Sequence, residues 1–289
     1  MSVNSGYAVP QARKVKNLIF AGLCLVSVMM GVIILFIVLY GAMHTGITRV
    51  SPDFLVKPPS MSNPDKAGVG PALWGSLWIV ALTLLFSVPF GIAAAIYLEE
   101  LTRPSKFKNF VLANISNLAG VPSIIYGILG LAVFVRWLGM GNSILAASLT
   151  MSLLVLPTVI LVTQESLRMV PRAYREASLA LGATKWQTLF RQILPNAFPT
   201  ILTGIIFSAS RAIGETAPLI VVGAVAFIRR APQDLSSSFT VMPLQIYNWS
   251  KEPTADFQRN ASAAIVVLLV SLLTLNLIAI VLRNKYRKV

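Results

Sequence analysis

Two charged residues, Arg211 and Glu215, lie within an apolar run of the chain at 199–228. The other strongly hydrophobic runs of the sequence contain no Asp, Glu, Lys or Arg. A charge near the middle of a bilayer costs about 2.5–3.5 kcal/mol on insertion scales, so such residues indicate a functional site. Because they are four residues apart, a helix would place them on one face, where they can pair. A guanidinium is a permanent cation with a planar fork of donors that suits an oxyanion.

The helix face around Arg211 also has the composition of a cavity wall. On a helix, the residues within about 60° of Arg211 are small or polar, except for two large apolar ones. They are Gly204, Phe207, Ser208, Gly214, Glu215, Pro218 and Val222. We therefore predict that Ser208, Arg211, Glu215 and Thr216 line a solute pathway. A second interpretation stays open, in which the pair is a buried ion pair that joins helices without touching solute.

The overall composition is that of an integral membrane protein. The chain has 289 residues, of which 56% are hydrophobic and 12% charged, whereas soluble domains carry about 25% charged residues. Its formal charge of +14 comes from basic residues in short flanks between apolar runs, which indicates membrane topology and lipid contact rather than nucleic-acid binding. Cys24 is the single cysteine, so an intrachain disulfide and a cysteine metal cluster are excluded.

Six apolar runs are long enough to span a bilayer, and none alternates as the strands of a membrane barrel do. They lie at 18–43, 72–98, 110–135, 143–163, 199–228 and 261–282. The first run is too long for the hydrophobic part of a signal peptide. The sequence therefore predicts an all-α integral membrane protein with six transmembrane helices.

The distribution of basic residues predicts the orientation of these helices. Most of the 24 Lys and Arg residues fall in the segments that a cytoplasmic N-terminus would place inside. By the positive-inside rule, both termini are expected in the cytoplasm. In the large outer loop that follows the fifth run, Tyr247 and Trp249 form an interfacial anchor or a docking surface for an external partner.

Prolines recur inside the predicted spans, at Pro89, Pro122, Pro157 and Pro218. Each removes one helical hydrogen bond and should kink or break its helix. The stretch from Gly120 to Gly127 combines Pro122 and Ser123 with glycines. Two interpretations stay open here: tight helix packing through small residues, or a pathway lined by Ser123.

The inner loop at 164–198 has the signals of two short helices. We expect the first helix at 172–181, after Pro171 and before Gly182. Thr184 and Gln187 form a capping box for the second. Its apolar side is made by Trp186, Leu189, Phe190, Ile193 and Leu194, and we expect Pro195 and Pro199 to end it.

This loop resembles the EAA loop shared by permease subunits of binding-protein-dependent ABC importers. The matching residues are Glu176, Ala177, Ser178, Gly182, Leu194 and Pro195, with Ser178 in place of the second Ala and Gln192 in place of an aliphatic residue. The resemblance implies a type I ABC importer permease architecture, in which these residues couple the chain to a cytoplasmic ATPase subunit. An interfacial helix that binds only lipid headgroups is the alternative.

Within that family, the stretch from Arg211 to Pro218 resembles the PstA type of phosphate importer permease. This resemblance implies a bacterial cytoplasmic (inner) membrane location and three kinds of partner: a PstC-type permease, two PstB-type ATP-binding subunits and an external PstS-type phosphate-binding protein. The sequence has no phosphate-binding loop of the Gly-x-x-x-x-Gly-Lys-Ser/Thr form, so ATP and Mg²⁺ would be used by a partner and no cofactor by this chain. Neither a catalytic triad nor a metal-ligand cluster is present in the sequence, so we predict a transport subunit and not an enzyme.

Glu215 has two possible roles beside phosphate. It could accept a hydrogen bond from a protonated phosphate oxygen, or act as the counter-ion of Arg211 in the empty state. Import of another oxyanion and an ion-driven secondary transporter or channel are the alternative functions. We divide the chain into an N-terminal tail, span and outer loop (1–70), a permease domain (71–284) and a basic cytoplasmic tail (285–289).

Overall fold

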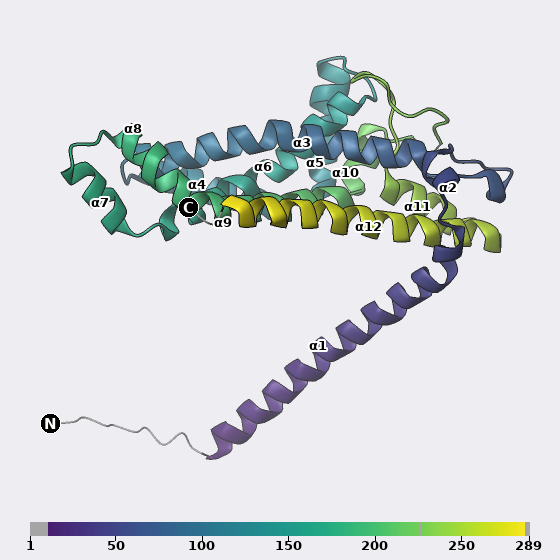
Figure 1. Cartoon of the computed structure of the whole chain (residues 1–289), viewed down its shortest axis with the longest axis horizontal. Helices are drawn as coiled ribbons and strands as arrows, with labels where there is room; N and C mark the ends of the chain where they lie inside the picture. The colour runs from purple at the N-terminus through teal and green to yellow at the C-terminus, as the bar shows by residue number, and fades with distance from the viewer. Residues whose placement is uncertain (1–10, 226, 287–289) are drawn as a thin grey trace.

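The computed structural model describes residues 11–225 and 227–286, and none of these forms a strand. Four long helices run side by side along the molecule (Figure 1): α3 (Gly70–Ile96), α6 (Ile144–Met169), α9 (Leu194–Gly214) and α12 (Ala255–Tyr286). Helix α6 packs against both α3 and α9 and buries a larger share of its length than the other spans. The predicted all-α membrane fold is confirmed. The outer parts of the two predicted tails, 1–10 and 287–289, lie outside the described residues.

Hydroxyl side chains join α3 to α6 at the centre of the bundle. The Thr83 hydroxyl donates to the Ser148 carbonyl oxygen at 3.4 Å, and the Ser152 hydroxyl lies 3.2 Å from the Thr83 carbonyl oxygen. Such small residues let two helix backbones approach closely. Pro89 and Pro157 lie inside these helices, which continue through them, so neither proline breaks a span.

The third predicted span, 110–135, is not one helix. It consists of two helical pieces that meet at 99°: α4 (Lys106–Ala119), and α5 (Ser123–Gly130) with the π-helical turn η4 (Leu131–Trp137). The break lies at Pro122, whose backbone is extended (φ −54°, ψ 133°) and which has no N–H to continue the helix. The structure therefore has five unbroken candidate spans and one bent pair among its described residues.

The helix that corresponds to the fifth predicted span, 199–228, begins and ends at residues other than those predicted. One continuous helix runs from Lys185 to Gly214 through α8 (Lys185–Thr188), the π-helical turn η5 (Leu189–Ile193) and α9. The prediction that Pro195 and Pro199 end the second short helix is therefore wrong. A π-helical turn shifts hydrogen bonds to the fifth residue, and this turn ends at Ile193, two residues before Pro195. Pro195 lies in the first turn of α9, where the missing N–H of a proline is tolerated.

The same helix stops earlier than expected, at Gly214. Pro218 cannot donate to the Gly214 carbonyl, and the chain becomes extended at Glu215 (φ −76°, ψ 129°). The short helix α10 (Ala217–Val222) then ends at Gly223, whose φ of +109° favours glycine. Arg211 and Glu215 thus lie at the end of a helix and not in the middle of one.

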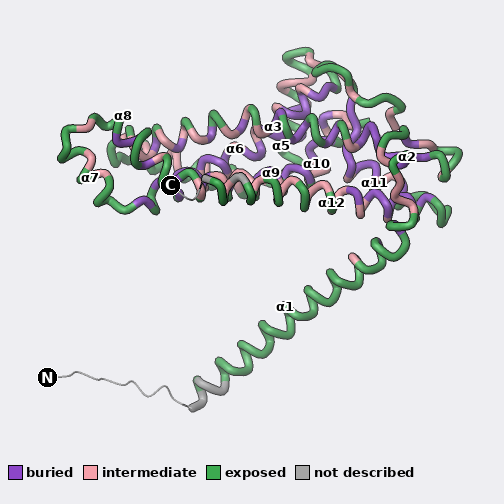
Figure 2. The backbone as a smooth tube through the Cα atoms, in the orientation of Figure 1, coloured by how far each residue is buried: buried purple, intermediate pink, exposed green. Residues whose placement is uncertain are grey.

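Helix α1 (Gln11–Gly46) stands apart from the bundle. Figure 2 shows it exposed along nearly all of its length. Its last turn packs on α12, where Gly46 lies against the backbone of Ser262 and Ala263. An apolar helix without protein neighbours along most of its length offers its sides to lipid or to another subunit.

Short elements close the end of the bundle that lies opposite α7. They are η1 (Ile47–Arg49), α2 (Pro52–Val56), η2 (Pro64–Lys66) and α11 (Met242–Ser250). Trp249 is buried there, with its ring centroid 6.0 Å from that of Phe54, so it is a core residue and neither an anchor nor a docking residue. Tyr247 is exposed and has the Lys251 ammonium 4.1 Å from its ring centroid.

Candidate functional site

Arg211 and Glu215 form a loose ion pair at the break between α9 and α10. Arg211 lies in the last turn of α9, and its Nε is 3.6 Å from Oε1 of Glu215. That distance exceeds the usual 2.7–2.9 Å of a charge-assisted hydrogen bond. The Arg211 side chain is 39% exposed and that of Glu215 is 20% exposed. Both groups therefore keep donors and acceptors available for another partner.

The two sequence stretches that contain Pro122 and Pro218 pack together. A Cβ atom at Gly127 of α5 would lie 2.7 Å from Cα of Pro218 and 2.9 Å from its carbonyl oxygen. Only glycine permits this approach of α5 to α10. Close packing through a small residue, one of the two interpretations of this stretch, therefore accounts for Gly127. Ser123 is partly exposed at the start of α5, and its pathway role stays a prediction.

Tyr126 bridges the break in the third span, and we did not single it out from the sequence. Its hydroxyl donates to the carbonyl oxygen of Leu118 at 2.8 Å, across the turn that contains Pro122. In an unbroken helix the N–H of residue 122 would be the donor to that carbonyl. The Tyr126 side chain is buried. A polar side chain four residues after a mid-span proline is the signal that could have revealed it.

The stripe predicted around Arg211 does not form one surface. Gly204 packs against the Val162 side chain of α6, whereas Phe207 is exposed. Ser208 is 1% exposed, and its Oγ has no hydrogen-bond partner among the described residues. A buried hydroxyl without a partner usually has a water or a bound group beside it. Thr216 is partly buried between α9 and α10, and the pathway roles of Ser208 and Thr216 stay predictions.

The 164–198 loop folds as its local signals predict. Helix α7 (Arg172–Ala180) is followed by Gly182 with φ +84°, a backbone conformation that favours glycine. The predicted capping box is present: the Thr184 hydroxyl accepts from the Gln187 N–H at 3.2 Å, and the Gln187 side chain accepts from the Thr184 N–H at 2.8 Å. The helix–glycine–helix arrangement is confirmed.

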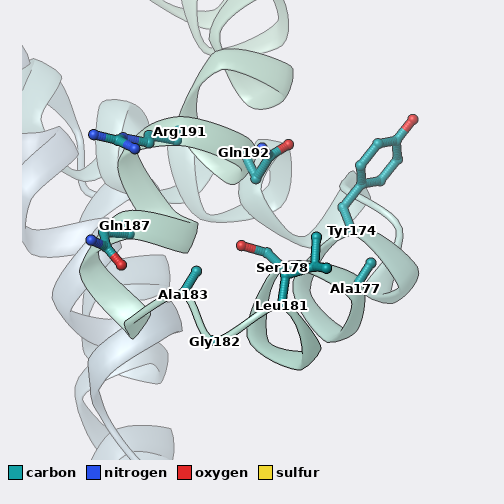
Figure 3. A pocket seen from close by; sticks show the side chains of 9 residues that line it. All are labelled: Tyr174, Ala177, Ser178, Leu181, Gly182, Ala183, Gln187, Arg191 and Gln192. Carbon is teal, nitrogen blue, oxygen red and sulfur yellow. The ribbon is translucent and has the colours of Figure 1, made fainter.

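A groove of about 480 Å³ lies between the two arms of this loop (Figure 3). Its lining comes from both arms: Tyr174, Ala177, Ser178, Leu181, Gly182, Ala183, Gln187, Arg191 and Gln192. The Ser178 and Thr188 hydroxyls, 2.9 Å apart, hold the arms together. Three of the predicted coupling residues, Ala177, Ser178 and Gly182, therefore line the groove. Glu176 is exposed on α7, while Leu194 and Pro195 lie at the start of α9 outside the lining.

The predicted apolar side of the second short helix divides into two. Leu189 and Ile193 are buried in a cluster with Leu167 and Ile201. Trp186 and Phe190 are exposed and stack on each other, with ring centroids 5.7 Å apart. The inward residues hold the loop on the bundle, and the aromatic pair faces outward.

Comparison with known protein families identifies the class of protein to which the loop groove and the Arg211–Glu215 pair belong. Residues 87–286 match the family described as "Binding-protein-dependent transport system inner membrane component". The chain belongs to this permease family. The matched region includes the groove of the 164–198 loop and the Arg211–Glu215 pair, so the family indicated by the loop residues is confirmed.

Individual relatives of this permease support the family assignment. It is 31% identical over 269 residues to the phosphate transport system permease protein PstA of Haemophilus influenzae, covering 92% of this chain and 93% of that protein. It is 36% identical over 191 residues to the probable ABC transporter permease protein YqgH of Bacillus subtilis, covering 64% of this chain. The chain spans only 61% of the length of YqgH.

Solved structures share the permease fold. A bacterial alginate ABC transporter, crystallised with an alginate-bound periplasmic protein, contains a chain that superposes with a TM-score of 0.65. The two chains are 17% identical, and the match covers 91% of this permease and 93% of that chain. The architecture is that of a type I ABC importer permease, and the permease is a multi-pass membrane protein.

Proposed function

We propose that this permease subunit forms half of the pathway by which an ATP-driven importer carries inorganic phosphate across the bacterial cytoplasmic membrane. The observation that carries the proposal is the loose Arg211–Glu215 pair at the break between α9 and α10. The similarity to PstA relatives supports phosphate as the solute. Arg211 provides a fixed positive charge at this break, and its side chain is 39% exposed, so a solute anion can reach it.

The chemistry of the pair suits phosphate. The Arg211 guanidinium can donate two parallel hydrogen bonds to one oxyanion. Glu215 can accept a hydrogen bond from a protonated phosphate oxygen, which sulfate cannot supply at neutral pH. In the empty state the carboxylate is the counter-ion of Arg211, which limits how tightly the anion is held.

The groove of the 164–198 loop supports a second part of the proposal. We infer that a PstB-type ATPase subunit binds here, with Glu176 as an exposed charged contact and Ala177, Ser178 and Gly182 at the surface of the groove. ATP and Mg²⁺ are used by that subunit. A PstC-type permease supplies the other half of the pathway, and a PstS-type protein delivers phosphate. The loop and both termini face the cytoplasm, in keeping with the positive-inside rule.

Substitution of Arg211 tests the phosphate pathway. In the complete complex in liposomes, we expect Arg211→Gln to lower phosphate uptake at least about 100-fold, as for loss of a charged contact worth about 3 kcal/mol. Arg211→Lys keeps the charge but not the fork of donors and should retain part of the activity. Arg259→Gln is the matched control because it breaks an exposed Arg–Asp pair at the start of α12. Normal uptake by both Arg211 variants would disprove the proposal.

A further inference from the structure

Two adjacent carboxylates at the end of α3 bind different parts of the molecule. Glu99 and Glu100 lie in the π-helical turn η3 (Tyr97–Leu101), a rare geometry that is frequent at functional sites. Glu99 accepts from Arg168 Nε and Gln164 Nε2, both at 2.9 Å, and Lys108 Nζ lies 3.8 Å away. These partners belong to α4 and α6, which already pack on each other.

Glu100 instead reaches the 164–198 loop. Arg175 of α7 donates from Nη2 to Oε1 of Glu100 at 2.6 Å and to the carbonyl oxygen of Leu167, in α6, at 2.9 Å. The Glu100 and Arg175 side chains are 14% and 26% exposed, so the contact is largely shielded from water. Among the ion pairs of the described residues, this is the one that joins α7 to another helix.

Apolar packing does little to hold α7 in place. None of the residues Arg172–Ala180 is buried, and Gly182 leaves an open turn after the helix. On its other side, α7 is tied to α8 through the Ser178–Thr188 hydroxyls. Apart from the two-residue link 170–171 to α6, the polar contacts of the Arg175 side chain therefore hold α7 against the ends of α3 and α6. The Arg175 Nε is buried with no hydrogen-bond partner among the described residues, and an unpaired buried group of this kind calls for an explanation.

We propose that the Glu100–Arg175 ion pair is a positioning contact that makes α7 move together with the ends of α3 and α6. The inference rests on the proposed function, because it assigns this pair the task of passing movement of the ATPase-binding loop to the spans. Arg175 serves this role through its two acceptors, one on each of the helices α3–η3 and α6. Coupling between distant parts of a protein is carried by packed side chains and by hydrogen-bond or salt-bridge networks that join rigid elements.

The test uses the complete importer in liposomes with the phosphate-loaded external binding protein. The readouts are phosphate transported per ATP hydrolysed and the half-saturating concentration of the loaded binding protein. Variants Glu100→Gln and Arg175→Gln should lower the transport-to-hydrolysis ratio about five-fold, the low end for coupling between sites, and leave the half-saturating concentration unchanged. The exchange Glu100→Arg with Arg175→Glu keeps the ion pair but removes the donor to the Leu167 carbonyl oxygen, so it should restore part of the ratio.

Glu99→Gln is the matched control because it changes the neighbouring carboxylate, whose partners lie in α4 and α6. Its complex should be less stable but keep the ratio of the unaltered complex. An unchanged ratio in Glu100→Gln, an equal loss in Glu99→Gln, or no recovery in the exchanged pair would overturn the positioning role. If the unaltered complex transports no phosphate, the proposed function itself fails, and the inference falls with it.

Discussion

The Arg211–Glu215 pair and the Glu99–Glu100 group both place acids near bases in helical spans, but they are built differently. Glu99 and Glu100 have partners at 2.6–2.9 Å from α6 and α7. Among the described residues, Arg211 and Glu215 have only each other as an ion pair, at 3.6 Å, beside a helix break. Charges that hold a fold together are fully paired, because an unpaired buried charge is costly. The loosely paired site is the one with capacity left for a solute.

The largest stability effect is expected at the fully paired group. Glu99→Gln removes the charge that Arg168 and Lys108 face, and a carboxamide accepts fewer and weaker hydrogen bonds. We expect the free energy of unfolding to fall by about 1.5–3 kcal/mol. Denaturant titration of the purified subunit in detergent measures this loss, with Asp53→Asn, which breaks an exposed pair, as control. If Glu99→Gln and Asp53→Asn had equal unfolding free energies, the Glu99–Glu100 group would stabilise the fold no more than an exposed ion pair does.

Close packing beside the loose pair gives the next effect. Gly127→Ala would place a methyl group 2.7 Å from Cα of Pro218, so α5 or α10 must move. We expect a loss of about 1–3 kcal/mol in unfolding free energy, together with reduced phosphate uptake, because α10 begins two residues after Glu215. Gly120→Ala is the control, since its nearest neighbour is the Asn117 carbonyl oxygen at 3.4 Å. A fully active, stable Gly127→Ala protein would contradict this packing.

A smaller effect is expected at the break in the third span. Tyr126→Phe keeps the ring but removes the donor to the Leu118 carbonyl oxygen. The expected loss is about 0.5–1.5 kcal/mol, the net value of one hydrogen bond. Tyr247→Phe, at an exposed tyrosine, should cost less. Equal unfolding midpoints for the two variants would show that the hydroxyl does not stabilise the bend.

Some of the structural features behind these effects can be predicted from the sequence, and others cannot. The Thr184–Gln187 capping box and Gly182 follow local rules, and the structure has both where we expected them. Pro122 and Pro218 are compatible with either a kinked or a broken helix, and the packing of Gly127 on Pro218 accompanies the broken form. That contact joins α5 to α10 through residues that are 91 positions apart in the sequence, and no local pattern encodes it.

Some of the charged site residues could likewise be found from the sequence, and others could not. Arg211 and Glu215 were evident because charges are rare in apolar runs and their spacing allows a pair. Glu99 and Glu100 were missed because they follow a span, where acids are ordinary, and their partners come from α4, α6 and α7. We wrongly expected Pro195 to end a helix, because the π-helical turn that ends two residues before it depends on tertiary packing.

The smallest stability effect is expected at the loose pair itself. Glu215→Gln should change the unfolding free energy by no more than about 1 kcal/mol, as for a solvent-accessible ion pair. Its effect should instead appear in selectivity: if Glu215 accepts the proton of phosphate, a carboxamide that can also donate will admit sulfate. Sulfate should then compete with phosphate uptake in the variant more strongly than in the unaltered complex. Unaltered sulfate competition would leave Glu215 with the counter-ion role alone, and a large loss of stability would place the pair with the fully paired group.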